Sequence, residues 1–359
     1  MTDLPSPPAR LAALLGVRYP LIQAPLAGVQ GSALALAVSR AGGLGSLPAA
    51  ALPPARLREE MQAMRGSSLP WNANFFCHAA PQPDAPRQAA WHALLKPYFD
   101  ELGLDAAHIP SGPGRQPFDG EAAALVAEFR PPVVSFHFGL PAPQALERIK
   151  RAGAFVLSSA TTVEEALWLQ AHGADAIIAQ GLEAGGHRGH FLSDDLTRQA
   201  GLFALLPQVV AAVRVPVIAA GGIATAAGVR AALALGAAGV QAGTAYLCAH
   251  EAATSPLYRA ALLAAAASGQ AHTALTTLMT GRPARGLPNR LTRELGPLNP
   301  AAPAFPLAAP AAAWLRAAAE KQGRADFSFF WCGENASACR SAPAAHITQA
   351  LAEGFAAAR

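Results

Sequence analysis

His187 is the strongest candidate for a catalytic residue in this sequence, because it lies in a stretch of backbone with few side chains. The stretch is GLEAGGHRGHF, residues 181–191, in which four glycines surround a histidine and an arginine. An imidazole titrates near neutral pH, so His187 could remove a proton when neutral or hold an anion when protonated. We expect the glycines to present this imidazole to a ligand with no other side chain in between.

Two further glycine-rich loops favour a phosphate group as part of that ligand. Gly221 and Gly222 lie in AAGGIATAAGV, whereas Gly243 and Thr244 lie in QAGTAYL. Each loop follows an apolar run, and the first leads into a predicted helix. Backbone N–H groups and a helix dipole together suit a phosphate. The alternative is that these glycines only form tight turns between strand and helix.

Polar side chains in other apolar runs complete a candidate binding site. Alternation along a strand places Ser135 and His137 on one face, and Val134, Phe136 and Phe138 on the other. Further polar residues in such runs are Gln23, Asn72, Asn74 and Gln180. Amides beside phosphate loops, with no acidic cluster, predict a flat heterocycle with a phosphate tail. The alternative is that buried amides satisfy one another inside the fold.

Eight short apolar runs must position these residues, and most precede a helical pattern that ends in glycine. The runs are residues 21–28, 43–49, 71–78, 131–139, 154–160, 174–181, 215–222 and 238–245. Strands that alternate with helices form a parallel sheet with right-handed crossovers. Eight such units in about 250 residues predict an α/β fold, a (β/α)₈ TIM barrel with its active site at the C-terminal strand ends. An open doubly wound sheet is the alternative, although no GxGxxG follows the first run.

The remaining segments predict a second lobe. We expect a barrel over residues 1–250, in which an insertion at 78–130 forms a substrate wall. Residues 251–335 are expected to form a small, mainly helical substrate or lid lobe, although their Pro/Ala-rich part could instead be a linker. Residues 336–359 are expected to return to the barrel with an amphipathic helix near 347–358.

Composition limits the partners. The net charge of +4 comes from scattered arginines without a charge run, which predicts no nucleic-acid binding. The 4 cysteines lack CxxC or metal-ligand spacing, so we expect neither a metal site nor a disulfide framework. The N-terminus lacks a signal-peptide pattern and no apolar stretch fits a membrane span, so a cytoplasmic monomer or homodimer is expected.

Several of these motifs together resemble a known family. They are QAPLAG, AGGLGSL, NANFFCH, SFHFGLP, GADAIIAQGLEAGGHRGHF, VPVIAAGGIA, GVQAGTA and GRPARGLPNR. They look like those of the class I nitronate monooxygenases, formerly called 2-nitropropane dioxygenases, and are most specific around residues 180–189. The resemblance implies a TIM barrel with a second lobe, bound FMN, and O₂-dependent oxidation of alkyl nitronates such as propionate 3-nitronate. The products would be a carbonyl compound and nitrite or nitrate, and the role detoxification of nitro compounds.

The resemblance also implies roles for individual residues. His187 would be the catalytic histidine, which either removes a Cα proton from a neutral nitroalkane or holds the anionic nitronate, while Ser135 and His137 would contact the substrate. The residues implied to bind or line FMN are Pro25, Leu26, Asn74, Gln180, Gly185, Gly186, Gly222, Gln241, Ala242, Gly243 and Thr244.

The sequence departs from the family pattern at a few positions. Leu26 replaces a usual Met and Val29 a usual Gly, while Phe99 and Phe305 each replace a usual Tyr. The segment WCGEN, residues 331–335 with Glu334, replaces a usual WAGQG. We expect these changes in the substrate wall and the second lobe, apart from the flavin site. Loss of two phenolic hydroxyls would remove hydrogen-bond donors to an anionic nitronate and could signal another substrate.

Three other functions compete with this interpretation. One is an FMN-dependent NAD(P)H:quinone or enoyl reductase on the same barrel, and another is a flavin-binding barrel without turnover. A flavin-free phosphate-binding isomerase or aldolase is disfavoured, because no lysine or carboxylate pair lies at a predicted strand end.

Overall fold

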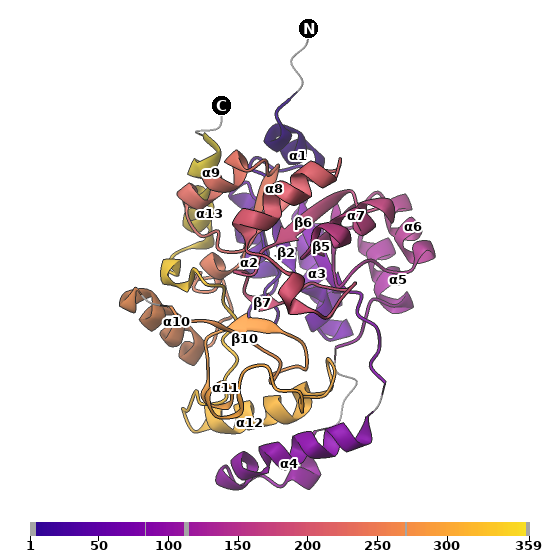
Figure 1. Cartoon of the computed structure of the whole chain (residues 1–359). Helices are drawn as coiled ribbons and strands as arrows, with labels where there is room; N and C mark the ends of the chain where they lie inside the picture. Colours follow the sequence, from indigo (N-terminus) through magenta and orange to yellow (C-terminus); the bar gives the residue numbers. More distant parts are fainter. Residues whose placement is uncertain (1–4, 83, 111–114, 270, 357–359) are drawn as a thin grey trace.

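An eight-stranded parallel barrel forms the centre of the molecule in the computed structural model, which describes residues 5–356 except 83, 111–114 and 270 (Figure 1). The strands are β1 (Leu21–Gln23), β2 (Gly45–Leu47), β3 (Trp71–Phe76), β4 (Val133–His137), β5 (Phe155–Ala160), β6 (Ala176–Gln180), β8 (Val217–Ala220) and β9 (Gly239–Ala242). They pair in the order β1-β9-β8-β6-β5-β4-β3-β2. The barrel closes where the Gln23 N–H donates to the Leu44 carbonyl at 2.9 Å and the Leu44 N–H to the Leu21 carbonyl at 2.8 Å. The predicted (β/α)₈ barrel is therefore confirmed, with strands shorter than the apolar runs.

Helices cover the outside of the barrel. They are α1 (Pro7–Leu15), α2 (Ser32–Arg40), α3 (Pro54–Gly66), α5 (Gly120–Phe129), α6 (Pro143–Arg151), α7 (Val163–Ala171), α8 (Leu202–Ala212), α9 (Ala226–Ala234) and α13 (Ala344–Ala356). The expected glycines follow α2, α6, α7 and α9, and have positive φ angles of 97°, 92°, 99° and 95° at Gly42, Gly153, Gly173 and Gly236. None of the helices in the described part of the chain has both the length and the apolar character of a bilayer span.

Strand alternation separates an inner from an outer core. Along β6, Ile178 points into the barrel, whereas Ile177 and Ala179 pack against the surrounding helices. Leu11 and Leu15 of α1 fill the N-terminal end of the barrel. This plug leaves the opposite end, where the strands terminate, for a binding site.

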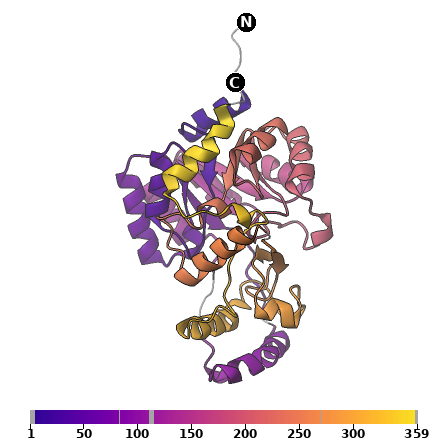
Figure 2. The ribbon, with the colours of Figure 1, turned by 90° about the vertical axis from the view of Figure 1, so that its left-hand side faces the viewer.

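The last helix returns to the barrel, as Figure 2 shows. Helix α13 packs between α2 and α9, and Thr348 forms a 2.9 Å hydrogen bond with the hydroxyl of buried Tyr246. The helix predicted near residues 347–358 begins earlier, at Ala344, and its positions 357 and 358 lie outside the described residues.

A second lobe contains helices and a small sheet that the sequence did not reveal. Its helices are α4 (Ala85–Glu101), α10 (Pro256–Ser268), α11 (Arg290–Leu295) and α12 (Ala309–Lys321). The sheet has the order β10 (Ala274–Thr276), β11 (Ala284–Gly286), β7 (Gly186–His187). Figures 1 and 2 both show α4 beside α12, on the side of the molecule away from the two chain termini. The insertion at 78–130 thus contributes α4 to the lobe, and the division at residues 250 and 335 stays a prediction.

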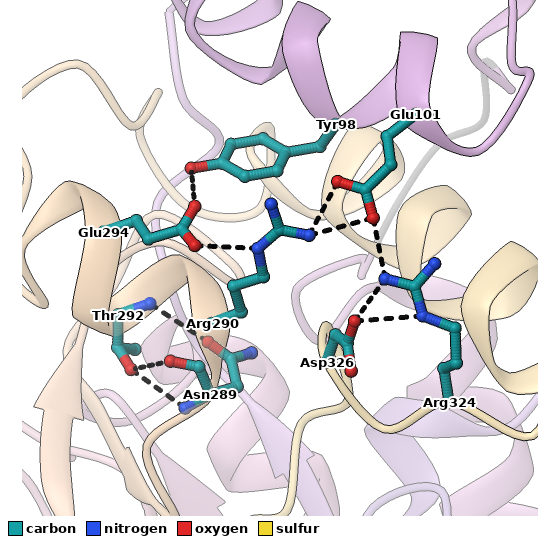
Figure 3. A network of polar contacts seen from close by, with 8 residues as sticks. All are labelled: Tyr98, Glu101, Asn289, Arg290, Thr292, Glu294, Arg324 and Asp326. Carbon is teal, nitrogen blue, oxygen red and sulfur yellow. Dashed lines mark hydrogen bonds and ion pairs between the residues drawn. The ribbon is translucent and has the colours of Figure 1, made fainter.

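Charged groups, shown in Figure 3, and an apolar cluster hold α4 on the lobe. Glu101 forms ion pairs of 2.7 Å with Arg290 and with Arg324, which lower the pKa of its carboxyl. The Tyr98 hydroxyl donates to Glu294 at 2.9 Å. Beneath them, Phe99 is fully buried and its ring lies 5.5 Å from that of Trp314. The expectation that Phe99 faces the substrate is therefore wrong, because the inner side of α4 packs on α12.

Candidate functional site

One pocket at the C-terminal ends of the strands gathers the predicted site residues. It is lined by Pro25, Leu26, Asn74, Ser135, His137, Gln180, Gly185, Gly186, His187, Gly222, Gln241, Gly243 and Thr244. Ala242 is the exception, since alternation along β9 turns Gln241 inward and leaves the Ala242 methyl in the outer core, 1% exposed. These residues come from six strands and their loops, which is the usual place for a barrel active site.

His187 is held by a strand of the lobe rather than by a free loop. Gly186 and His187 form β7, which pairs with β11 so that His187 faces Ala284. The Arg188 N–H continues the pairing to the Pro283 carbonyl at 2.9 Å. The motif GRPARGLPNR, distant in sequence, therefore fixes the backbone that carries His187.

The amide of Gln180 fixes the same backbone from the barrel side. Its Nε2 donates to the His187 carbonyl at 3.0 Å, and its Oε1 accepts from the Gly189 N–H at 2.8 Å. His137 Nε2 donates to the same His187 carbonyl at 3.1 Å, while its Nδ1 accepts from the Ser159 hydroxyl at 2.9 Å. Because both ring nitrogens are engaged, His137 positions His187 through its backbone.

Arg188 lies fully buried behind the pocket. Its guanidinium donates to Gln199 Oε1 at 2.7 Å and to the carbonyls of Gly181 and Gln180 at 2.6 and 2.8 Å. Burial lowers the pKa of Arg188 to about 10, so the group remains charged at neutral pH. The guanidinium thus joins the end of β6 to the His187 segment.

The imidazole of His187 is neutral and has a defined tautomer. Its Nε2 lies 2.9 Å from the Thr280 hydroxyl, which donates to the Arg282 carbonyl at 3.4 Å. Nε2 therefore carries the proton, and the lone pair remains on Nδ1. Burial, followed by the charges of Arg115 and Arg282, lowers the pKa of His187 well below its ordinary value. The imidazole is therefore unprotonated at neutral pH, which leaves the lone pair on Nδ1 free.

Aromatic rings surround His187. The ring centroids of Phe76, Phe138, Phe305 and Trp331 lie 6.4, 6.2, 5.2 and 5.9 Å from that of His187. Phe138 was expected on the face opposite His137, and that expectation is wrong. Strand β4 ends at His137, and the left-handed backbone of Phe138 (φ 70°) turns its ring toward Phe76 and Phe305 instead.

Buried amides partly satisfy one another below the pocket. The Ser135 hydroxyl accepts from Asn72 at 2.9 Å and from Asn74 at 3.0 Å. Gln23 bonds to Gln30 at 2.8 Å and does not line the pocket. By contrast, Oε1 of Gln241 is buried without a hydrogen-bond partner among the described residues. Gln241 is thus the amide in the pocket wall that offers an unmet polar atom to a ligand.

Another part of the pocket has the features of an anion cradle. Gly221 and Gly222 have φ angles of 123° and 67°, which expose backbone there, and α9 follows with Thr225 as its N-cap. The Thr244 hydroxyl accepts from the Gly333 N–H at 2.9 Å. Among the described residues, no group of three or more His, Cys, Asp or Glu side chains could hold a metal ion.

We expected the WCGEN segment to lie away from the predicted cofactor site, and that expectation is wrong. Gly333 and Asn335 line the same pocket, and the Asn335 amide donates to the Gly222 carbonyl at 2.9 Å. Sequence reasoning also missed Arg115, Glu183 and Tyr258, which line the pocket as well. The departures from the family pattern in WCGEN could have indicated that this segment lines the pocket. The contact between residues 335 and 222, however, arises only in the folded chain.

Comparisons with known proteins extend over almost the whole chain. The profile of a family described as nitronate monooxygenase matches residues 9–354. A nitronate monooxygenase of Pseudomonas aeruginosa is 42% identical over 96% of this chain and 98% of its own length. One of Paraburkholderia phytofirmans is 41% identical over 98% of this chain and 96% of its own length.

Solved structures give the same picture. A nitroalkane oxidase from Streptomyces ansochromogenes superposes with a TM-score of 0.86 at 37% identity, covering 97% of this chain and 100% of that one. FabK from Thermotoga maritima superposes with a TM-score of 0.70 at 24% identity, covering 99% and 97%. The second likeness concerns the fold alone.

We expect the free energy of unfolding to fall as the pH is lowered from about 7 to about 5. Burial lowers the pKa values of His137 and His190 to about 3. The unfolded chain would protonate both near pH 6.5, so it binds more protons in this window, and each histidine lowers stability by about 1.4 kcal/mol per pH unit. Urea unfolding should show a shallower pH slope for His137→Gln than for the wild type. Exposed His346→Gln serves as the control, and an unaltered slope in His137→Gln would contradict the assignment.

Proposed function

Because the chain belongs to the nitronate monooxygenase family, a family of oxidoreductases, we propose that it uses FMN to oxidise alkyl nitronates with O₂. Propionate 3-nitronate is a representative substrate, the products are a carbonyl compound and nitrite or nitrate, and the role is detoxification. The observation that carries this proposal is the neutral, rigidly held His187 in a pocket that also contains an anion cradle.

The pocket residues fit FMN. Gly222, Gly243 and Thr244 would receive its phosphate, close to the N-terminus of α9. The unmet Oε1 of Gln241 would accept a hydrogen bond from an N–H of the flavin ring. Pro25, Leu26, Asn74, Gln180, Gly185 and Gly186 would line the ring. Bound FMN would accept electrons from the substrate and deliver them to O₂.

The protein's own groups would handle the proton. With its lone pair on Nδ1, His187 would take the Cα proton of a neutral nitroalkane and so generate the nitronate in place. Gln180 and His137 would hold the imidazole in position through the His187 carbonyl. The rings of Phe76, Phe138 and Phe305 would exclude water from the reacting carbon.

Anaerobic mixing tests the function. The purified protein is loaded with FMN and mixed first with propionate 3-nitronate and then, in a separate sample, with NADH. A change in the flavin spectrum with the nitronate, followed by O₂ uptake and nitrite release in air, supports the proposal. A protein that takes up no FMN would overturn it, and bleaching by NADH but not by nitronate would indicate the reductase.

His187→Asn should retain FMN and lose activity on neutral nitroalkanes. Removal of a general base lowers the rate by about 10²–10⁴-fold, whereas a preformed nitronate needs no proton abstraction and should be affected much less. Steady-state kcat/KM on nitroethane and on its nitronate measures both effects. Exposed His346→Asn is the control, and unchanged nitroethane turnover in His187→Asn would remove His187 from the mechanism.

Gln241→Leu should weaken FMN binding without lowering the stability of the FMN-free protein. Loss of one hydrogen bond to the flavin should weaken FMN binding by up to about tenfold. The FMN-free protein should be no less stable, because the substitution removes a buried oxygen without a partner. Fluorescence titration with FMN and urea unfolding measure the two effects, with exposed Gln208→Leu as control. Equal FMN affinity would exclude contact between Gln241 and the flavin.

A further inference from the structure

Arg115 is a pocket residue to which neither the sequence motifs nor the comparisons assign a role. It lies in the 78–130 insertion, on the stretch that returns from α4 to the barrel, and lines the same pocket as His187. Its guanidinium carbon lies 5.9 Å from the centroid of the Phe76 ring. The insertion therefore contributes a cation to the aromatic end of the pocket.

The backbone around Arg115 is fixed against the end of β3. His78 Nε2 donates to the Arg115 carbonyl at 3.1 Å, and the Phe118 N–H donates to the Phe76 carbonyl at 2.7 Å. On the other side of the insertion, the ion pairs of Glu101 hold α4 on the lobe (Figure 3). Arg115 thus lies on a segment anchored to the barrel and preceded by a helix that is anchored to the lobe.

The charge of Arg115 has no counterion in the described part of the chain. No acidic side chain there forms an ion pair with it, and burial together with the neighbouring charge of Arg316 lowers its pKa. Glu183 also lines the pocket, but both of its carboxylate oxygens accept from the Leu202 N–H at 2.8 Å, at the start of α8. A guanidinium in such surroundings stays charged and favours an anionic partner.

Positive groups dominate the surroundings of His187. After burial, the charge of Arg115 lowers the pKa of His187 most, and the charge of Arg282 lowers it further. The guanidinium carbon of Arg282 lies 4.3 Å from the centroid of the Phe138 ring, and the group donates to the His190 carbonyl. Phe305, whose ring centroid is 5.2 Å from that of His187, has no hydroxyl to donate. Arg115 is thus the pocket-lining cation at this end.

We propose that Arg115 binds the negative charge of the substrate and makes the pocket selective for the anionic nitronate over the neutral nitroalkane. The inference rests on the proposed function. A nitronate carries its charge on two coplanar oxygens, which a planar guanidinium can engage with two parallel hydrogen bonds. The aromatic walls exclude water and so strengthen this attraction.

The test uses the FMN-loaded protein and the two protonation states of one substrate, nitroethane and ethyl nitronate, which interconvert slowly enough to be assayed separately. Arg115→Gln should raise KM for ethyl nitronate by about 30-fold or more, which is the loss of one charge-assisted contact. The KM for nitroethane, which binds as a neutral molecule, should change by less than about threefold. Arg115→Lys should recover part of the loss, because it restores the charge without the fork of donors.

Arg316→Gln is the matched control. It removes a nearby cation that affects Arg115 but does not line the pocket. An equal rise in KM in Arg316→Gln would attribute the effect to distant charge and overturn the proposal. An equal rise in KM for both substrates in Arg115→Gln, or an unchanged KM for the nitronate, would also overturn it.

Binding of nitrate, a planar oxyanion, provides a readout that is independent of turnover. Calorimetric titration should show nitrate binding at least about tenfold weaker in Arg115→Gln than in the wild type and in Arg316→Gln. Equal nitrate affinity in all three proteins would overturn the anion site. If the wild type binds nitrate through Arg115 but does not oxidise nitronates, the proposed function fails while the anion site stands.

Discussion

The position of His187 depends on one side-chain amide. Gln180, the last residue of β6, donates to the His187 carbonyl and accepts from the Gly189 N–H. Its amide therefore fixes the backbone on both sides of Arg188. Both bonds require one conformation of that backbone, and β11 imposes it by pairing with Gly186 and His187. The barrel and the lobe therefore meet at the histidine itself. Any movement of the lobe sheet would displace the imidazole relative to the pocket floor.

Most of the glycines around His187 leave space for other segments of the protein and not for a ligand. A Cβ atom at Gly185 would lie 2.5 Å from the backbone of Cys332, and one at Gly189 would lie 2.7 Å from Cε1 of His137. At Gly181 it would lie 2.5 Å from the Leu202 nitrogen. Only Gly186 of these four, with a φ angle of 73°, has open space around the missing side chain. The bare stretch is thus a crossing point where β6, α8, His137 and the WCGEN segment approach one backbone.

Local pattern was enough to predict the barrel, because the apolar runs and the glycines that end several helices are encoded within a few residues. The same alternation predicted that Ser135 and His137 share a face, but it failed at Phe138, where the strand had already ended. What the sequence could not supply were partners distant along the chain. Thr280 sets the tautomer of His187, and Gly333 bonds to Thr244. Phe99 similarly turned out to pack on Trp314, because helix α4 docks on the lobe.

The electrostatics of the pocket separate two tasks, proton transfer and anion binding, that the sequence analysis considered for His187. A histidine can accept a proton or hold an anion, but not both in the same protonation state. Burial and the surrounding cations keep His187 neutral, which suits the proton acceptor. Arg115 and Arg282 remain charged because guanidinium pKa values are high enough to survive desolvation. Under the proposed function, the arginine holds the charge while the imidazole handles the proton. The cations that lower the pKa of His187 would therefore also stabilise the nitronate that its base chemistry produces.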